Sequence, residues 1–218
     1  MTTDLSGLTR LLMWVSPAFP TGGFAWSHGL EWAVESGDIK DGETLRLWLS
    51  GVIVHGAGRN DTILLRHAHR AWNDPATLRV LAALALATAT SRERRDESLA
   101  QGRAFLKAAS AWDVPETPED MPHALALGVM AGAHGIAEND AAAAWLQNFT
   151  TALISAAVRL VPLGQTAGLR VLAALEPVML GVVLTTREAS LDDLGGCAFR
   201  SDIAAMRHET QYTRLFRS

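Results

Sequence analysis

The sequence is poor in cysteine and in clustered positive charge, and each shortage excludes a class of protein. Its one cysteine, Cys197, can form neither an internal disulfide nor a cysteine-rich zinc framework. A net charge of −4 and a pI near 6.0 provide no broad cationic field, which argues against nucleic acid or an anionic membrane as the main partner. The composition therefore indicates a protein of a reducing compartment that binds no nucleic acid and no membrane.

Targeting and membrane-spanning signals are also lacking. The opening residues Met1-Thr2-Thr3-Asp4 carry no basic region that would precede a signal sequence. The longest apolar stretch, residues 169–184, is interrupted by Arg170, Glu176 and Pro177. We therefore expect a cytoplasmic protein.

Strand patterns are absent as well, and helical periodicity takes their place. No alternating run of Val, Ile and Thr is bounded by an Asn-Gly or Asp-Gly turn. Apolar residues instead recur at i, i+3, i+4 and i+7, as in Leu45, Trp48, Leu49 and Val52. With 218 residues and 49% hydrophobic content, the chain can bury one sizeable core. These features predict an all-α, single-domain bundle of about eight to ten helices.

Local signals place several helix ends. Asp74 followed by Pro75, and Ser91 before a charged turn, are typical helix starts. The proline-rich segment 112–122 and the Val161-Pro162-Leu163-Gly164 sequence are expected to interrupt helices. A further helix is expected from about Trp26 to Ser36.

The C-terminal segment differs in composition from the rest. We divide the chain into a helical domain, residues 1–196, and a tail, residues 197–218, which begins after Gly195-Gly196. The tail combines arginine with aromatic residues, the types enriched at interface hot spots, and has few aliphatic residues. We expect a segment that is flexible alone and orders on a partner, the alternative being a frayed terminus without a role. The candidate partner-binding residues are Arg207, His208, Glu209, Tyr212, Arg214, Phe216 and Arg217.

A second irregular region, residues 16–24, contains Gly22-Gly23 between two expected helices. Glycines of this kind can bring backbone N–H groups to a phosphate. The sequence contains no Gly-Lys pair, since its only lysines are Lys40 and Lys107. We therefore predict a left-handed turn and no nucleotide site. The neighbouring aromatics Phe19, Phe24 and Trp26 either fill the core or form a second contact surface.

Candidate catalytic and metal-binding groups are few. Ser27, His28 and Glu31 have the spacing of a nucleophile, a base and an orienting group, but no oxyanion device accompanies them. His67 and His69 lie two residues apart, which on a helix directs them to different faces. The sequence thus predicts no cofactor and no metal site of its own. An acid/base enzyme using His28/Glu31 or His208/Glu209 remains the less favoured alternative.

Several motifs together resemble one known family. Residues 16–24, read as Ser-Pro-Ala-Phe-Pro-Thr-Gly-Gly-Phe, and the following Ser27-His28-Gly29-Leu30-Glu31 are similar to the opening signature of UreF-type urease accessory proteins. Segments 91–103, 155–165 and 202–218 fit the same family in the same order. Two positions depart from the pattern: Trp26 replaces a frequent tyrosine and Leu169 a frequent glutamine. The signature residues are Pro17, Phe19, Gly22, Gly23, Phe24, Ser27, Gly29 and Glu31.

The resemblance implies a function without catalysis by this chain. It implies a homodimeric all-α protein that joins a UreD/UreH-type accessory protein and the GTPase UreG on apo-urease. Such an assembly supports carbamylation of the urease active-site lysine and the insertion of nickel. The resemblance also associates the C-terminal segment with the UreD/UreH contact and with the platform for UreG. The remaining alternative is a structural helical subunit of some other complex.

Overall fold

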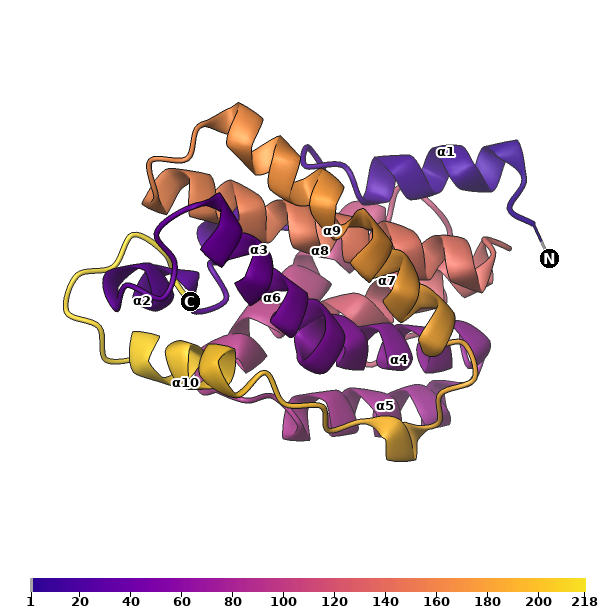
Figure 1. Cartoon of the computed structure of the whole chain (residues 1–218). Helices are drawn as coiled ribbons and strands as arrows, with labels where there is room; N and C mark the ends of the chain where they lie inside the picture. Colours follow the sequence, from indigo (N-terminus) through magenta and orange to yellow (C-terminus); the bar gives the residue numbers. More distant parts are fainter. Residues whose placement is uncertain (1) are drawn as a thin grey trace.

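The computed structural model describes residues 2–218, which form ten α-helices and two short 3-10 helices, with no strand among them (Figure 1). The all-α prediction is confirmed. The helices are α1 (Leu5–Trp14), η1 (Gly23–Ala25), α2 (Leu30–Glu35), α3 (Gly42–His55), α4 (Ala57–Arg70), α5 (Pro75–Ala87), α6 (Arg92–Ala109), α7 (His123–Ala133), α8 (Glu138–Leu160), α9 (Gln165–Thr185), η2 (Leu191–Asp193) and α10 (Phe199–His208).

The short helix α7 lies in the core and packs against α4 and α6. Nine of its residues, His123 to Ala131, are buried on all sides. Its glycine allows a very close approach to α4, because a Cβ built on Gly128 would lie 2.3 Å from the backbone oxygen of Leu65. The small side chains of alanine and glycine therefore allow the helices of the core to pack closely.

Most of the predicted helix ends are confirmed. The Asp74 side chain accepts hydrogen bonds at the start of α5, and Ser91 does the same for α6. One boundary is wrong, since α2 begins at Leu30 and not near Trp26. His28 and Gly29 have φ angles of 60° and 76°. Two successive left-handed residues cannot belong to a right-handed helix, so the chain turns there before α2 starts.

Helices α8 and α9 are long and apolar enough, by length and composition alone, to span a membrane. In α8 the fold buries 56% of the most apolar window, which is typical of a core helix. In α9 it buries 33%, and Leu169, Leu180 and Leu184 are exposed along its outer side. Helix α9 thus presents an apolar face at the surface of the fold.

The last part of the chain returns to the beginning. After α9, the connection passes α5 and leads into α10, which packs against α2 and α6 (Figure 1). The final residues then curve round α2, so that the C-terminus lies beside it (Figure 1). This path brings the tail to the signature segment of the sequence.

Candidate protein interaction site

Three buried glutamates lie where the tail meets the body of the protein. Glu31 belongs to α2, and Glu93 and Glu97 belong to α6; their exposed fractions are 9%, 6% and 7%. We call these residues the glutamate cluster. A buried carboxylate is costly unless hydrogen-bond donors surround it. In this fold many of those donors come from the tail, both from α10 and from the residues after it.

Glu31 and Glu93 both bind residues of the tail. The Glu31 carboxylate accepts backbone hydrogen bonds from Leu215 (2.6 Å) and Phe216 (2.9 Å). The Glu93 carboxylate pairs with the guanidinium of Arg214 at 2.8 Å. His208 lies between the two carboxylates, with Nε2 3.2 Å from Glu31 and Nδ1 2.7 Å from Glu93. The two glutamates are thus linked through one imidazole ring.

Glu97 binds the end of the chain. Its carboxylate accepts hydrogen bonds from Arg94, from Gln101 and, at 2.9 Å, from the hydroxyl of Ser218. The Ser218 carbonyl accepts the backbone N–H of Ser27 at 2.6 Å. Ser27 belongs to the signature segment, so this segment and the glutamate cluster both hold the end of the chain, residues 214–218.

Aromatic contacts complete the docking of the tail. Phe216 is 5% exposed, and the guanidinium of Arg159 lies 4.3 Å from the centre of its ring. Arg217 donates its backbone N–H to Ala25 and stacks over Trp26 at 5.9 Å. The shortage of aliphatic residues suggested that the tail had little core on which to dock. It docks instead through buried carboxylates and one buried ring, while its ordering on a partner stays a prediction.

The tail residues singled out from the sequence divide into two groups. His208 and Phe216 are buried within the protein, and Arg214 is held by Glu93. Glu209 accepts the backbone N–H of Arg92 at 2.8 Å and so caps α6. Arg207, Tyr212 and Arg217 are exposed, Tyr212 completely. Arg207, Tyr212, Arg217 and the exposed part of Arg214 can contact another protein without detachment of the tail.

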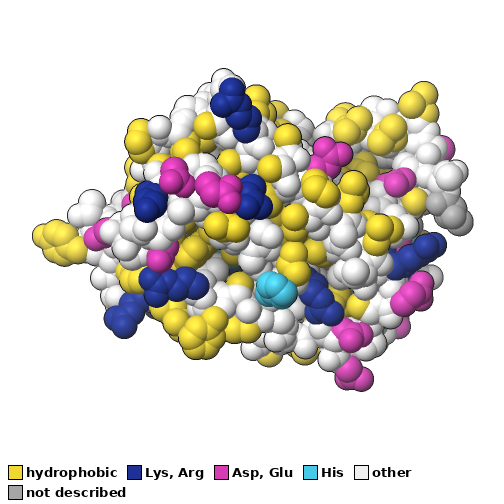
Figure 2. Space-filling model, viewed as in Figure 1, with side chains coloured by type: hydrophobic (Ala, Val, Ile, Leu, Met, Phe, Trp, Pro, Cys, Tyr) yellow, Lys and Arg dark blue, Asp and Glu magenta, His cyan; other side chains and the backbone are white. Residues whose placement is uncertain are grey.

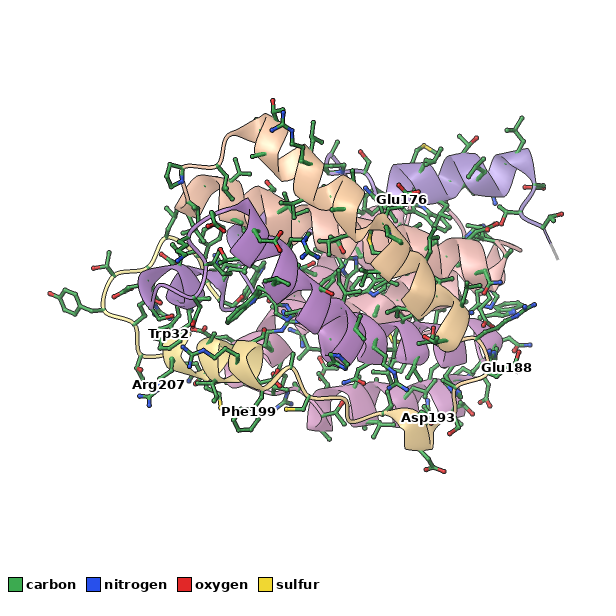
Figure 3. All side chains as sticks on the ribbon, in the orientation of Figure 1. Trp32, Glu176, Glu188, Asp193, Phe199 and Arg207 are labelled. Atoms are coloured by element: carbon green, nitrogen blue, oxygen red, sulfur yellow. The ribbon has the colours of Figure 1, made fainter. Side chains whose placement is uncertain are left out.

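Three exposed apolar residues of the tail were not among the candidates from the sequence. Phe199, Met206 and Leu215 are 72%, 51% and 66% exposed. Together with Tyr212 we call them the α10 face. Phe199 and Arg207 project from α10 away from the body (Figure 3), and hydrophobic groups protrude at the lower left of the molecule over this region (Figure 2). The spacing of Phe199 and Met206, seven residues apart on one helix, was the available signal.

The signature residues also serve two different parts of the fold. Ser27, Gly29 and Glu31 contact α10 and the tail: a Cβ on Gly29 would lie 2.6 Å from the backbone nitrogen of Ala205. Phe19 packs against Phe105 and Trp112 in the core, with ring centres 5.4 and 6.3 Å apart.

The turn between these two parts is open to solvent. Gly22 has a φ of 73°, which confirms the predicted left-handed turn, and Gly23 begins η1. Phe24 is 76% exposed, whereas Trp26 is 9% exposed. Pro17 is exposed. Of the loop aromatics, Phe19 and Trp26 therefore fill the interior, and Phe24 is available for a contact.

Several histidines are buried or form contacts within the protein. Burial, with a smaller contribution from Arg94, holds the pKa of His28 well below its usual value. The rings of His67 and His69 contact the carbonyls of Ala189 and Ile136, 3.1 and 2.7 Å away. Among residues 2–218 no group of three or more His, Cys, Asp or Glu side chains is placed to hold a metal ion.

A small cavity of about 60 Å³ lies beside His28, between α4, α6 and α10. It is lined by polar groups that include Asn60, Asp61, Arg94 and Asp202. Burial raises the pKa of Asp61 to about 6, although Arg94 opposes the shift. Because the folded pKa lies above the unfolded value near 3.8, ionisation of Asp61 costs stability as the pH rises through this interval.

Replacing Asp61 with asparagine is therefore expected to stabilise the protein near neutral pH. Allowing for the partial exposure of the side chain, we expect a gain of about 2 kcal/mol at pH 7.5 that falls towards zero at pH 4. Urea unfolding at both pH values measures the difference, with the exposed Asp96→Asn as the control. An equal effect at the two pH values would contradict the assignment.

Comparison with known proteins agrees with the motifs. A family model described as UreF matches residues 39–176. A protein named urease accessory protein UreF from Bradyrhizobium sp. (strain BTAi1) is 51% identical, and the match covers 99% of this chain and 93% of the relative. A protein of the same name from Mesorhizobium japonicum is 48% identical, and the match covers 97% of this chain and 96% of the relative. Another, from Rhodopseudomonas palustris (strain BisA53), is 49% identical, and the match covers 98% of this chain and 94% of the relative. The chain therefore belongs to the UreF family.

Proposed function

We propose that this chain is a urease accessory protein that acts as a scaffold. Its helical body holds the α10 face in a fixed position, and this face binds a UreD/UreH-type accessory protein. The resulting complex recruits the GTPase UreG to apo-urease for nickel insertion. The chain supplies contacts to these proteins and performs no chemical step itself.

The observation that carries the proposal is the contrast between the two sides of the tail. On the inner side, Glu31 and Glu93 fix the backbone and Arg214. On the outer side, Tyr212 is fully exposed, and Phe199 at the start of α10 and Leu215 beyond its end are also exposed. Large aromatic side chains held in place on a surface are typical of interface hot spots, since little conformational entropy is lost on binding.

The apolar face of α9 is the second surface in the proposal. A groove of about 440 Å³ between α8 and α9 is lined by Leu169, Leu172, Met179, Leu180 and Val183. Exposed apolar patches of this kind mark protein contacts. We assign this face to the homodimer that is expected of the family, which leaves the α10 face of each copy free for the accessory protein. The departure at Leu169 adds apolar area to this groove.

Replacing Tyr212 with alanine tests the proposed interface. The loss of an exposed hot-spot ring is expected to weaken capture of the UreD/UreH-type partner at least about 30-fold, which corresponds to about 2 kcal/mol. The melting temperature should not change, because the ring contacts little of its own chain. Titration of the purified partner by calorimetry gives the affinity.

The matched control is Val80→Ala on α5, which removes an apolar side chain that is 64% exposed elsewhere on the surface. It should bind the partner as the unmodified chain does. Equal affinities for all three proteins would exclude the α10 face as the docking site. Failure of the unmodified chain to capture either accessory protein would instead favour a structural subunit of another complex.

A further inference from the structure

His208 occupies a position that its sequence context did not reveal. It is the last residue of α10, its exposed fraction is 0%, and it therefore cannot touch a partner directly. Both nitrogens of its ring face carboxylate oxygens, 2.7 Å from Glu93 and 3.2 Å from Glu31. A carboxylate can only accept hydrogen bonds, and an imidazole donates from both nitrogens only when it is positively charged.

The charges around the ring also indicate that His208 is positively charged. The glutamate cluster contributes three negative charges in a buried region. The cations that contact these carboxylates are Arg94, which pairs with Glu97, and Arg214, which pairs with Glu93. A charged His208 brings the region to neutrality, whereas a neutral ring would leave one buried negative charge without compensation.

The ring also joins three separate elements. It belongs to α10, and through its two contacts it joins α10 to α2 and to α6. Its position at the C-terminal end of a helix further favours a positive charge, because the backbone carbonyl groups of the helix point there. The last part of the tail, residues 209–218, begins directly after this residue, and Tyr212 follows four positions later.

We infer that His208 is a positioning residue whose positive charge fixes α10 and the tail on the glutamate cluster, and thereby presents the α10 face to the accessory protein. This inference rests on the proposed function for its last step only. The attachment of the tail can be measured on the isolated chain, without a partner.

The test is a pair of variants that separates charge from shape. His208→Gln keeps a side chain able to form hydrogen bonds but removes the positive charge, and it leaves Glu93 and Glu31 undercompensated. We expect amide hydrogen exchange in residues 213–218 to accelerate on the order of 100-fold, because one partner of a buried pair is lost. Adding Glu93→Gln removes the excess negative charge, so the double variant should recover most of the protection.

A direct spectroscopic readout accompanies the exchange measurement. The ring nitrogens of His208 in the unmodified protein, labelled with 15N, should have chemical shifts of the imidazolium form at pH 7. A merely structural, neutral histidine would show one protonated and one unprotonated nitrogen. That result, or a double variant no better protected than His208→Gln, would overturn the inference.

Partner affinity distinguishes this inference from the proposed function. If the tail of His208→Gln loses its protection from hydrogen exchange and partner capture also falls, the inference about His208 and the proposed function both stand. If the tail loses protection while capture is unchanged, the role of His208 in positioning the tail stands and the α10 face is not the docking site. If the tail of His208→Gln keeps its protection, or the ring of the unmodified protein is neutral, the inference fails whatever the affinity.

Discussion

Replacing Gly29 with alanine is expected to destabilise the protein by about 3 kcal/mol and to separate α10 from α2. The residue has a φ of 76°, a conformation that costs an alanine about 1–2 kcal/mol. In addition, the new Cβ would lie 2.6 Å from the nitrogen and 2.8 Å from the Cα of Ala205. These atoms belong to the backbone of α10, so the helix itself must move, which adds a packing cost of about 1–3 kcal/mol.

Gly37 provides the matched control for this experiment. Its φ is 79°, but a Cβ there would meet no atom within 4 Å. Gly37→Ala should therefore show the conformational cost alone, about 1–2 kcal/mol, and should retain the partner. Chemical unfolding and partner titration of both variants separate the two costs. Equal stabilities and equal affinities would mean that the close approach of Gly29 to α10 has no importance.

Replacing Glu31 with alanine is expected to have the largest effect on the tail. The change removes the acceptor of Leu215 N–H and Phe216 N–H and one of the two carboxylates at His208. Breaking a buried charged interaction costs about 3–5 kcal/mol. We expect the tail to leave the body, limited proteolysis to cleave it within residues 209–218, and urease activation in cells to be lost.

Glu35 lies one turn further along α2 and provides the control. It is exposed and contacts the tail through Gln211 only, so Glu35→Ala should cost less than about 1 kcal/mol. Each variant replaces one glutamate of α2 with alanine, so the two changes are chemically identical. A protease-resistant tail in Glu31→Ala would contradict the role given to the glutamate cluster.

The fold was largely predictable because its signals are local. The caps at Asp74 and Ser91 and the breaks at 112–122 and 161–164 each depend on a few neighbouring residues. The start of α2 was predicted wrongly because the left-handed conformation of His28 depends on what surrounds it. The backbone of α10 and the last residue of the chain lie against this turn, and no window of sequence contains them.

The candidate site was predictable only in part, for a similar reason. Arginine and aromatic content drew attention to residues 207–217, of which Tyr212 and Arg207 are exposed. The same criterion could not separate the buried His208 and Phe216 from the exposed residues. That separation depends on Glu31, Glu93 and Arg159, which are 50 or more residues distant in sequence. Glu93 and Glu97 of α6 are likewise buried, although charged side chains usually lie at the surface.

Hydrogen exchange of the free chain and of its complex with the UreD/UreH-type partner tests the central claim most directly. In the free chain, the amides of Leu215 and Phe216 should already be protected, because both are bonded to the buried Glu31. On complex formation, new protection should appear in residues 199–217 around the α10 face. Partner-induced protection confined to other helices, with residues 199–217 unchanged, would contradict the account.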